Sequence, residues 1–204
     1  MTPFRIAVFA SGQGSNFQAL AEAAAAGRLG GATVDLLVCD KPEAPVVKRA
    51  QALGIDTYLF RPKEYDSREA YEAEIASELA RRGIDLIVLA GYMRLLTAVL
   101  VKPYEGRMIN IHPSLLPAFP GKDAIGQALD YGVKVTGITV HLVDGGMDTG
   151  AIVAQQPVEM VQGESRESLE AKIHAAEMKL YPQAVSAFAE GKVVIEGRKV
   201  TIRH

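Results

Sequence analysis

The stretch RIAVFASGQGSN, residues 5–16, decides the predicted fold of this 204-residue chain. It joins a short apolar run to a glycine-rich loop, and the residues after the loop have the spacing of a helix. Strands that are apolar on both faces and alternate with helices are typical of a parallel sheet covered by helices. The sequence therefore predicts an α/β fold with a doubly wound, mostly parallel sheet and helices on both faces. The expected strands cover residues 5–10, 34–39, 56–60 and 85–90, and the expected helices cover residues 16–26, 44–52 and 67–82.

The helix expected at residues 67–82 has the clearest local pattern. Tyr71, Ile75 and Leu79 recur at every fourth residue and form one apolar stripe along it. Asp66 stands just before the first turn, which itself carries an acid, so Asp66 is the expected N-cap.

The second half of the chain has a different pattern. Three prolines within eight residues, Pro113, Pro117 and Pro120, predict a rigid loop rather than a regular element. No internal repeat, low-complexity tract or linker is present, so a single domain over residues 1–204 is expected. Around the loop we expect strands at 108–111, 135–142 and 151–158, a helix at 123–131, a long helix with Leu169, Ile173, Ala176 and Leu180 on one face, and a hairpin at 192–203 that turns at Glu196-Gly197.

The composition excludes several classes of protein. Hydrophobic residues make up 49% of the chain and charged residues 23%, the balance of an ordinary globular protein. A formal net charge of −2 gives no global attraction to nucleic acid or to a membrane surface. The single cysteine, Cys39, excludes an internal disulfide, and no apolar stretch approaches the ~20 residues of a membrane span. We expect a cytoplasmic protein without a nucleic-acid or membrane partner, and the sequence leaves a homodimer open.

The glycine loop at residues 11–16 lies where a strand gives way to a helix. The first N–H groups of a helix lack partners, so this position favours an anion. The preferred interpretation is a phosphate monoester bound at residues 14–16. A nicotinamide dinucleotide site competes with it, because Asp40 ends the next strand where a ribose-binding acid would stand, but Phe17 replaces the third glycine of that fingerprint. A tight turn before a capped helix, with no ligand, also accounts for the loop.

The NIHPS motif at residues 110–114 lies where an expected strand ends. Side chains repeat every two residues along a strand, so Asn110 and His112 face the same side at the sheet edge where open α/β folds bind ligands. An amide NH₂ and an imidazolium N–H can both donate to an oxygen that becomes negative during acyl transfer. A histidine can also move protons near neutral pH. The alternative is a buried histidine bonded to a backbone carbonyl, with the asparagine capping the loop.

The turn-rich segment HLVDGGMDTG, residues 141–150, joins two expected strands. Aspartates in such a segment bond their own backbone, which would make it a wide hairpin loop and nothing more. An aspartate held near His112 would instead orient the imidazole, although no sequence rule folds Asp148 onto that ring. Covalent catalysis is not favoured, because Cys39 falls within an expected strand and no Gly-x-Ser-x-Gly motif occurs. A metal site is not favoured either, because the four histidines lack paired ligand spacing.

Taken in series, these motifs resemble those of the phosphoribosylglycinamide formyltransferase family, folate-dependent enzymes of purine biosynthesis. The matches span nearly the whole chain in the expected order. They are SGQGSN (11–16), GYMRLL (91–96), NIHPSLLPAFPG (110–121), HLVDGGMDTGAIVAQ (141–155) and HAAEMKLYP (174–182). One departure is Lys122-Asp123, where some relatives carry a histidine, and it affects only details of that loop. The resemblance implies a Rossmann-like enzyme that uses 10-formyltetrahydrofolate as co-substrate, glycinamide ribonucleotide as acceptor and no metal.

The resemblance also implies a role for each matching position. The catalytic group would be Asn110, His112 and Asp148. The substrate phosphate and ribose would be held by Gly14, Ser15, Asn16, His174 and Glu177. The folate cleft would be lined by Arg68, Met93, Arg94, Leu95, Leu96, Asn110, Val143, Asp144 and Asp148. The phosphate site would then fall mainly in an N-terminal half, about residues 1–105, and the folate and catalytic groups mainly in a C-terminal half, about residues 106–204.

Three alternatives to this function stay open, and one of them is a non-catalytic ligand-binding module on the same fold. Other 10-formyltetrahydrofolate-dependent enzymes, such as methionyl-tRNA formyltransferase or formyltetrahydrofolate hydrolase, share the Asn/His/Asp group but resemble larger chains with an added domain. A nicotinamide-binding oxidoreductase, from a different class, remains suggested by the first strand, the glycine loop and Asp40.

Overall fold

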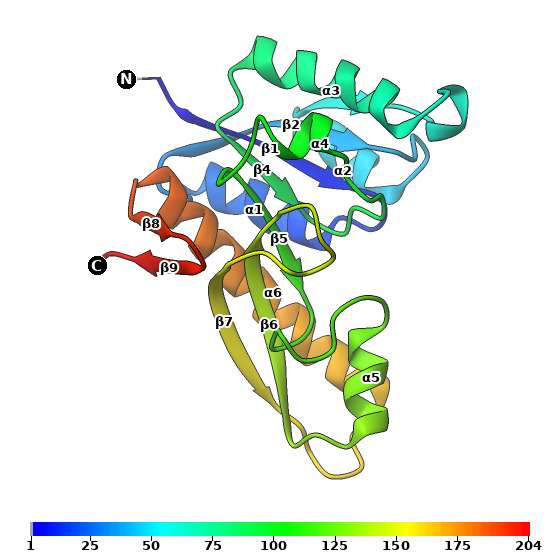
Figure 1. Cartoon of the computed structure of the whole chain (residues 1–204), viewed down its shortest axis with the longest axis vertical. Helices are drawn as coiled ribbons and strands as arrows, with labels where there is room; N and C mark the ends of the chain where they lie inside the picture. Colours follow the sequence, from blue (N-terminus) through cyan, green and yellow to red (C-terminus); the bar gives the residue numbers. More distant parts are fainter. Residues whose placement is uncertain (1) are drawn as a thin grey trace.

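The computed structural model describes residues 2–204 and contains a seven-stranded sheet and a separate two-stranded hairpin (Figure 1). The strand order in the large sheet is β3-β2-β1-β4-β5-β6-β7, and β6 alone runs in the direction opposite to the other six strands. The strands are β1 (Phe4–Ala10), β2 (Ala32–Cys39), β3 (Asp56–Leu59), β4 (Leu86–Leu89), β5 (Met108–His112), β6 (Val135–Leu142), β7 (Ile152–Glu159), β8 (Val193–Glu196) and β9 (Lys199–Ile202). The helices are α1 (Ser15–Ala25), α2 (Pro45–Ala52), the 3₁₀ helix η1 (Pro62–Glu64), α3 (Arg68–Arg82), α4 (Ala98–Val101), α5 (Ala124–Tyr131) and α6 (Arg166–Ala189). The predicted fold class is confirmed.

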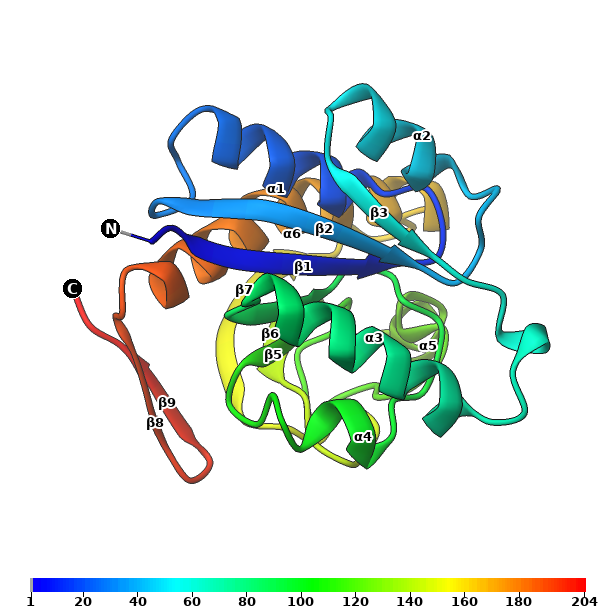
Figure 2. The same ribbon diagram turned by 90° about the horizontal axis from the view of Figure 1, so that it is seen from above.

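The central strands are buried on both faces, as their unbroken apolar sequence predicts. Along β1, Ile6 and Val8 pack into one hydrophobic cluster, whereas Ala7 and Phe9 pack into another on the opposite side of the sheet. Figure 2 shows α1, α2 and α6 over the first face and α3 and α4 over the second. Side chains that alternate along a strand therefore supply both layers of the core.

The N-terminus of α3 corrects one sequence prediction. Asp66 was the expected cap, but the Ser67 hydroxyl accepts the N–H of Ala70 at 3.1 Å, so the prediction of Asp66 is wrong. Ser67 is the extended residue immediately before the first helical residue, Arg68, and only from that position does a short side chain reach the third N–H of the helix.

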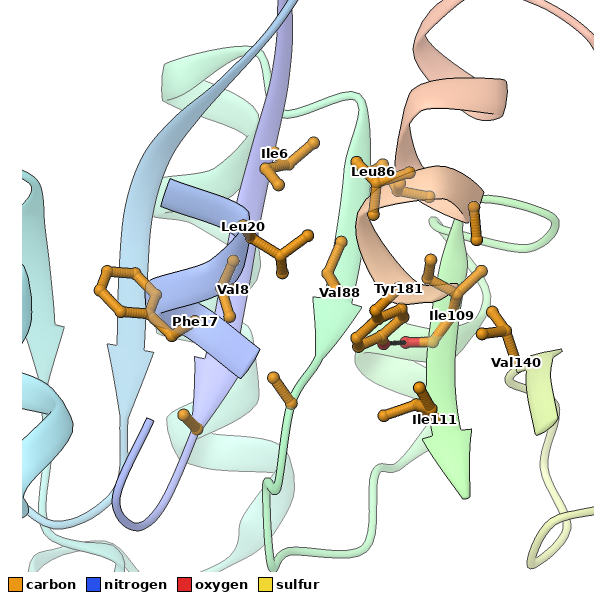
Figure 3. Packing of buried hydrophobic residues seen from close by; sticks show 14 of the residues in the cluster. Ile6, Val8, Phe17, Leu20, Leu86, Val88, Ile109, Ile111, Val140 and Tyr181 are labelled. Atoms are coloured by element: carbon orange, nitrogen blue, oxygen red, sulfur yellow. Dashed lines mark hydrogen bonds between the residues drawn. The ribbon is translucent and has the colours of Figure 1, made fainter. Parts of the chain in front are cut away.

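The long helix α6 fastens two central strands through one buried tyrosine. The predicted apolar face is present, although Leu180 is half-buried and the neighbouring Tyr181 is fully buried. The Tyr181 hydroxyl donates to the carbonyl of Leu89 at 2.6 Å and lies 3.2 Å from that of Ile109 (Figure 3). These carbonyls belong to β4 and β5, so α6 ties together the strands whose ends carry Ala90 and Asn110.

The strand order reverses between β1 and β4, because β2 and β3 lie on one side of β1 while β4, β5 and the later strands lie on the other. In doubly wound folds the loops diverge at such a point and leave a crevice at the carboxyl ends of the strands. The glycine loop after β1 and the segment after β4 lie at this edge, and β5 ends there as well. Across residues 2–204, no helix is long and apolar enough to cross a membrane.

Candidate active site

A first pocket of about 430 Å³ lies at the point where the strand order reverses, and we call it the glycine-loop pocket. It is lined by Ser11, Gly12, Gln13, Gly14, Ser15, Asn16, Lys41, Ala90, Gly91, Met93, Ile111, Pro113, His174 and Glu177. All five residues predicted to hold the phosphate and ribose are therefore brought together, although α6 is separated from the glycine loop by most of the chain.

The start of α1 offers backbone donors to this pocket. Gly14 precedes the helix in the left-handed conformation (φ 79°), and a side chain there would overlap Val46, so glycine is required. Among the described residues, no side chain caps α1, and its first turn carries no acid. The uncapped N–H groups and the helix dipole favour an anion at this position.

Polar side chains from α6 complete the pocket. Asn16 donates through Nδ2 to Oε2 of Glu177 at 3.3 Å, and Nδ1 of His174 lies 3.3 Å from the same oxygen. Hydrogen bonding to Glu177 raises the pKa of His174. The Asn16 Oδ1 atom is buried and has no hydrogen-bond partner within residues 2–204.

Lys41 also lines the glycine-loop pocket and was not predicted. It stands two residues after the end of β2, at the same sheet edge as the glycine loop. Its position after a predicted parallel strand was the available signal, because the carboxyl ends of neighbouring parallel strands meet at one edge.

A second opening of about 460 Å³ lies beside the first, and we call it the aspartate-loop cleft. It is lined by Arg68, Leu89, Tyr92, Arg94, Leu95, Leu96, Asn110, His141, Val143, Asp144, Gly145, Gly146, Met147 and Asp148. Eight of the nine residues predicted for the folate site line it. Met93 does not: it lines the glycine-loop pocket instead, because the 91–96 segment passes between the two openings.

The three predicted catalytic residues come together where the two openings adjoin. Asn110 and Asp148 line the aspartate-loop cleft, and His112 stands in the chain between Ile111 and Pro113, which line the glycine-loop pocket. Nδ1 of His112 lies 3.5 Å from Oδ2 of Asp148, and Asn110 lies two residues before His112 on β5. His112 and Asp148 are almost fully enclosed, with side chains 7% and 12% exposed. Asp148 therefore reaches the histidine, which the sequence alone did not show.

One ring nitrogen of His112 bonds to the proline-rich loop, which leaves the other nitrogen to face Asp148. Nε2 lies 2.8 Å from the carbonyl oxygen of Phe119, and a carbonyl can only accept, so Nε2 carries a hydrogen. Nδ1 is then the ring nitrogen that faces Asp148. The proline-rich loop thus sets the tautomer of His112. The alternative prediction, a buried histidine bonded to a backbone carbonyl, describes Nε2 but not Nδ1.

Asp148 is held in place by a backbone contact from that same loop. Its Oδ2 accepts the N–H of Gly121 at 2.8 Å, and its backbone adopts the left-handed conformation (φ 55°). The rest of the loop is stabilised by Asp144, which accepts the N–H of Gly146 at 2.9 Å and the hydroxyl of Thr149 at 2.6 Å. The predicted self-bonding of aspartates therefore applies to Asp144, while Asp148 reaches outward.

His141 belongs to the same group and was missed. It pairs directly with Asn110 across β5 and β6, and its Nε2 lies 3.3 Å from Nδ2 of Asn110 and 3.6 Å from Oδ1 of Asp148. Its Nδ1 lies 2.9 Å from the carbonyl of Leu142, so Nδ1 carries the hydrogen and Nε2 accepts from the Asn110 amide. Burial lowers the pKa of His141, which keeps this acceptor neutral.

The surroundings of Asp40 and Cys39 do not suit the two other roles considered for them, a ribose ligand and a nucleophile. Asp40 is buried and accepts hydrogen bonds from the Ser11 hydroxyl and the Arg94 guanidinium, so its oxygens do not face a ribose. Cys39 is buried at the end of β2, and burial raises the pKa of its thiol, which disfavours a nucleophilic thiolate.

This arrangement suits acyl transfer between two bound molecules. The Asn110 amide, oriented by His141, is a donor where the two openings adjoin, and the His112 ring lies beside Asp148 two residues further along β5. Donors fixed in a mostly buried site stabilise a developing oxyanion without reorganisation.

A model of the formyl transferase family matches residues 4–185, and the chain belongs to that family. It is 50% identical over 181 residues to the phosphoribosylglycinamide formyltransferase of Bacillus subtilis (strain 168), covering 89% of this chain and 92% of the relative. Glycinamide ribonucleotide transformylase 1 from Symbiobacterium toebii superimposes with a TM-score of 0.95 at 44% identity, over 99% of this chain and 95% of that one. The corresponding protein from Geobacillus kaustophilus gives a TM-score of 0.90 at 54% identity, over 92% of this chain and all (100%) of that one. The resemblance to phosphoribosylglycinamide formyltransferases is confirmed, and with it the expectation of an enzyme of that kind.

Proposed function

We propose that this chain transfers the formyl group of 10-formyltetrahydrofolate to the amine of glycinamide ribonucleotide. The observation that carries the proposal is the group of Asn110, His112 and Asp148 at the junction of two pockets of different character. One pocket offers helix N–H groups for a phosphate, and the other offers apolar and cationic side chains. The names of the relatives give the acceptor and the transfer of a formyl group, and the folate donor is the co-substrate that the resemblance implies.

The glycine-loop pocket would hold the ribonucleotide. Its phosphate would lie against the N–H groups of Gly14, Ser15 and Asn16, with the Lys41 ammonium nearby. His174 and Glu177 would bond the ribose hydroxyls, since a carboxylate accepts and an imidazolium donates. The amine of the substrate would then extend toward Asn110, past the end of β4.

The aspartate-loop cleft fits a folate. Leu89, Leu95, Leu96 and Val143 provide apolar surface for its ring system. Backbone groups of the 93–96 segment and of the 143–148 loop provide donors and acceptors for the ring nitrogens. The glutamate tail is anionic and would lie near the guanidinium of Arg68 at the start of α3.

In the proposed reaction the acceptor amine attacks the formyl carbon, and the tetrahedral intermediate collapses with loss of tetrahydrofolate. Asn110 and protonated His112 would donate to the oxyanion, a contribution of ~3–4 kcal/mol for each such donor. Asp148 would stabilise the imidazolium. The attacking amine would lose a proton to Asp148, directly or through water, and the departing folate nitrogen would gain one from Nδ1 of His112. Transfer of a proton from Asp148 to His112 would then restore both groups. All of these groups come from one chain, which we propose acts as a single domain.

The proposal is tested by mixing the purified protein with 10-formyltetrahydrofolate and glycinamide ribonucleotide and following the folate product. We expect saturable turnover, which Asn110→Ala and His112→Ala each reduce about 100-fold or more in kcat while substrate binding survives. His204→Ala, a change in an exposed histidine at the end of the chain, is the matched control. Folded protein with no rate above background would rule the proposal out, and normal turnover by His112→Ala would remove the assigned role of that residue.

A further inference from the structure

Asp40 is a buried carboxylate that the proposed chemistry does not use. Its side chain is fully enclosed, with 0% exposure. The Ser11 hydroxyl donates to Oδ1 at 2.6 Å, and Nε of Arg94 donates to Oδ2 at 2.8 Å. The two oxygens of one carboxylate therefore bind two different segments of the chain.

Those segments belong to different pockets. Ser11 begins the glycine loop and lines the glycine-loop pocket, whereas Arg94 lines the aspartate-loop cleft. The Ser11 hydroxyl also accepts the N–H of Met93 at 3.0 Å, and the Ser11 N–H donates to the carbonyl of Gly91 at 3.1 Å. Asp40 and Ser11 thus join the two loops directly, with no intervening element.

The far end of the 93–97 segment is fastened as well. Glu72, fully buried on α3, accepts the N–H of Thr97 at 3.0 Å and its hydroxyl at 2.9 Å. Because Thr97 is held independently by Glu72, the contacts with Ser11 and Asp40 are what hold the Met93–Arg94 end of the segment.

We propose that Asp40 is a positioning residue that couples the two substrate pockets, so that occupation of one favours binding in the other. This inference rests on the proposed function in so far as the two pockets take two different substrates. A buried carboxylate is costly unless both oxygens are paired, so Asp40 favours the one geometry that satisfies Ser11 and Arg94 together. A ligand that orders the glycine loop then orders the segment across it, and the second ligand has less conformational entropy to lose.

A purely structural ion pair would give a different result. It would lower stability when removed, but it would leave the affinity of each pocket independent of the other. Coupling between ligands is therefore the decisive measurement, because a reciprocal change in two affinities cannot arise from general destabilisation.

The test measures tetrahydrofolate binding by calorimetry with and without glycinamide ribonucleotide, a pair that cannot react. In the wild type we expect the ribonucleotide to tighten tetrahydrofolate binding about 5- to 10-fold, within the usual range of coupling between sites. In Asp40→Asn the effect should fall below about twofold, because the neutral amide has one acceptor oxygen for two donors. Hydrogen exchange at the Met93 amide should also accelerate in this variant, a readout that needs neither ligand.

The matched control is Asp35→Asn. Asp35 lies on the same strand and pairs with Arg82 at 3.3 Å, but toward the opposite end of β2 from the pockets. It should keep the wild-type coupling. If Asp40→Asn does not fold, Ser11→Ala and Arg94→Lys test the same contacts from either side, and each should lower the coupling.

Wild-type coupling in Asp40→Asn, with unchanged exchange at Met93, would overturn the proposal, as would an equal loss in Asp35→Asn. A wild type without coupling would overturn it too. These outcomes are distinct from failure of the proposed function, in which the wild type would show no turnover with the two substrates.

Discussion

Replacing Asp148 with asparagine removes a charge with little change in shape, so it isolates the electrostatic role of this residue. Asparagine tolerates the left-handed backbone that Asp148 adopts (φ 55°) better than other side chains except glycine. Its amide oxygen can still accept the Gly121 N–H that the aspartate accepts at 2.8 Å. The loop should therefore keep its conformation, while His112 loses its neighbouring anion.

The size of the effect follows from the 3.5 Å separation of His112 Nδ1 and Asp148 Oδ2. Two unit charges at this distance attract by about 5 kcal/mol at an effective dielectric constant of 20. The net loss is smaller, because both ions give up hydration in forming the pair, and a hydrogen bond to a charged group contributes about 1.5–3 kcal/mol. Asp148→Asn should therefore lower kcat by roughly 10- to 150-fold, with little change in the KM for the ribonucleotide.

Steady-state kinetics at pH 7.5 with both substrates measure this loss, and calorimetric binding of the ribonucleotide checks that its pocket is intact. Asp66→Asn, the same change at an exposed position before α3, is the control and should leave kcat unchanged. A kcat for Asp148→Asn within about threefold of the wild type would refute the view that the carboxylate stabilises a protonated His112 in the transition state.

Three other predictions concern pH dependence and stability. Burial lowers the pKa of His141 below 6.5, so its contribution to stability is present above that pH and is lost as the pH falls toward the lowered pKa. Between pH 7.5 and 5.5 the free energy of unfolding in urea should therefore fall less for His141→Gln than for the wild type. Bonding to Glu177 raises the pKa of His174, so binding of the ribonucleotide should weaken as the pH rises through that value, and calorimetry should find no such step in His174→Ala. Tyr181→Phe removes a buried hydroxyl from its carbonyl acceptors and should cost about 1–2 kcal/mol, a fall of about 2–8 °C in Tm by calorimetry, with Tyr131→Phe, at an exposed tyrosine, as control.

The layers of the fold could be predicted because the pattern that specifies them is local. A run such as residues 6–10 is apolar at every position, and only a strand covered on both faces buries all of it. Asn110 and His112 could be placed together for a similar reason, because two residues that are two positions apart on one strand point to the same face of the sheet. The short helix α4 was missed because four residues carry too little periodicity to distinguish a helical turn from a loop.

Contacts between segments far apart in the chain could not be derived in this way. His141 stands next to Asn110 because β5 and β6 pair antiparallel in a particular register, and neither strand alone specifies that register. Asp40 resembled a ribose ligand because dinucleotide-binding folds carry a ribose-binding acid at the end of the second strand, where Asp40 stands. Whether its oxygens face a cofactor or the Ser11 and Arg94 side chains depends on the path of the 91–96 segment, which the second strand does not encode.

The position of Asp148 depends on contacts outside the sheet. The 143–150 loop leaves β6 beside Met108, where Val143 donates to the Met108 carbonyl at 2.9 Å, and must return over β5 to reach His112. Two hydrogen bonds hold the returning part of the loop. The Gly121 N–H donates to the Asp148 carboxylate, and Arg198 of the C-terminal hairpin donates to the Thr149 carbonyl at 3.0 Å. Asn110 and His112 are fixed by strand register and Asp148 by these contacts. Loosening the loop would therefore separate the carboxylate from its histidine while leaving the oxyanion donors in place.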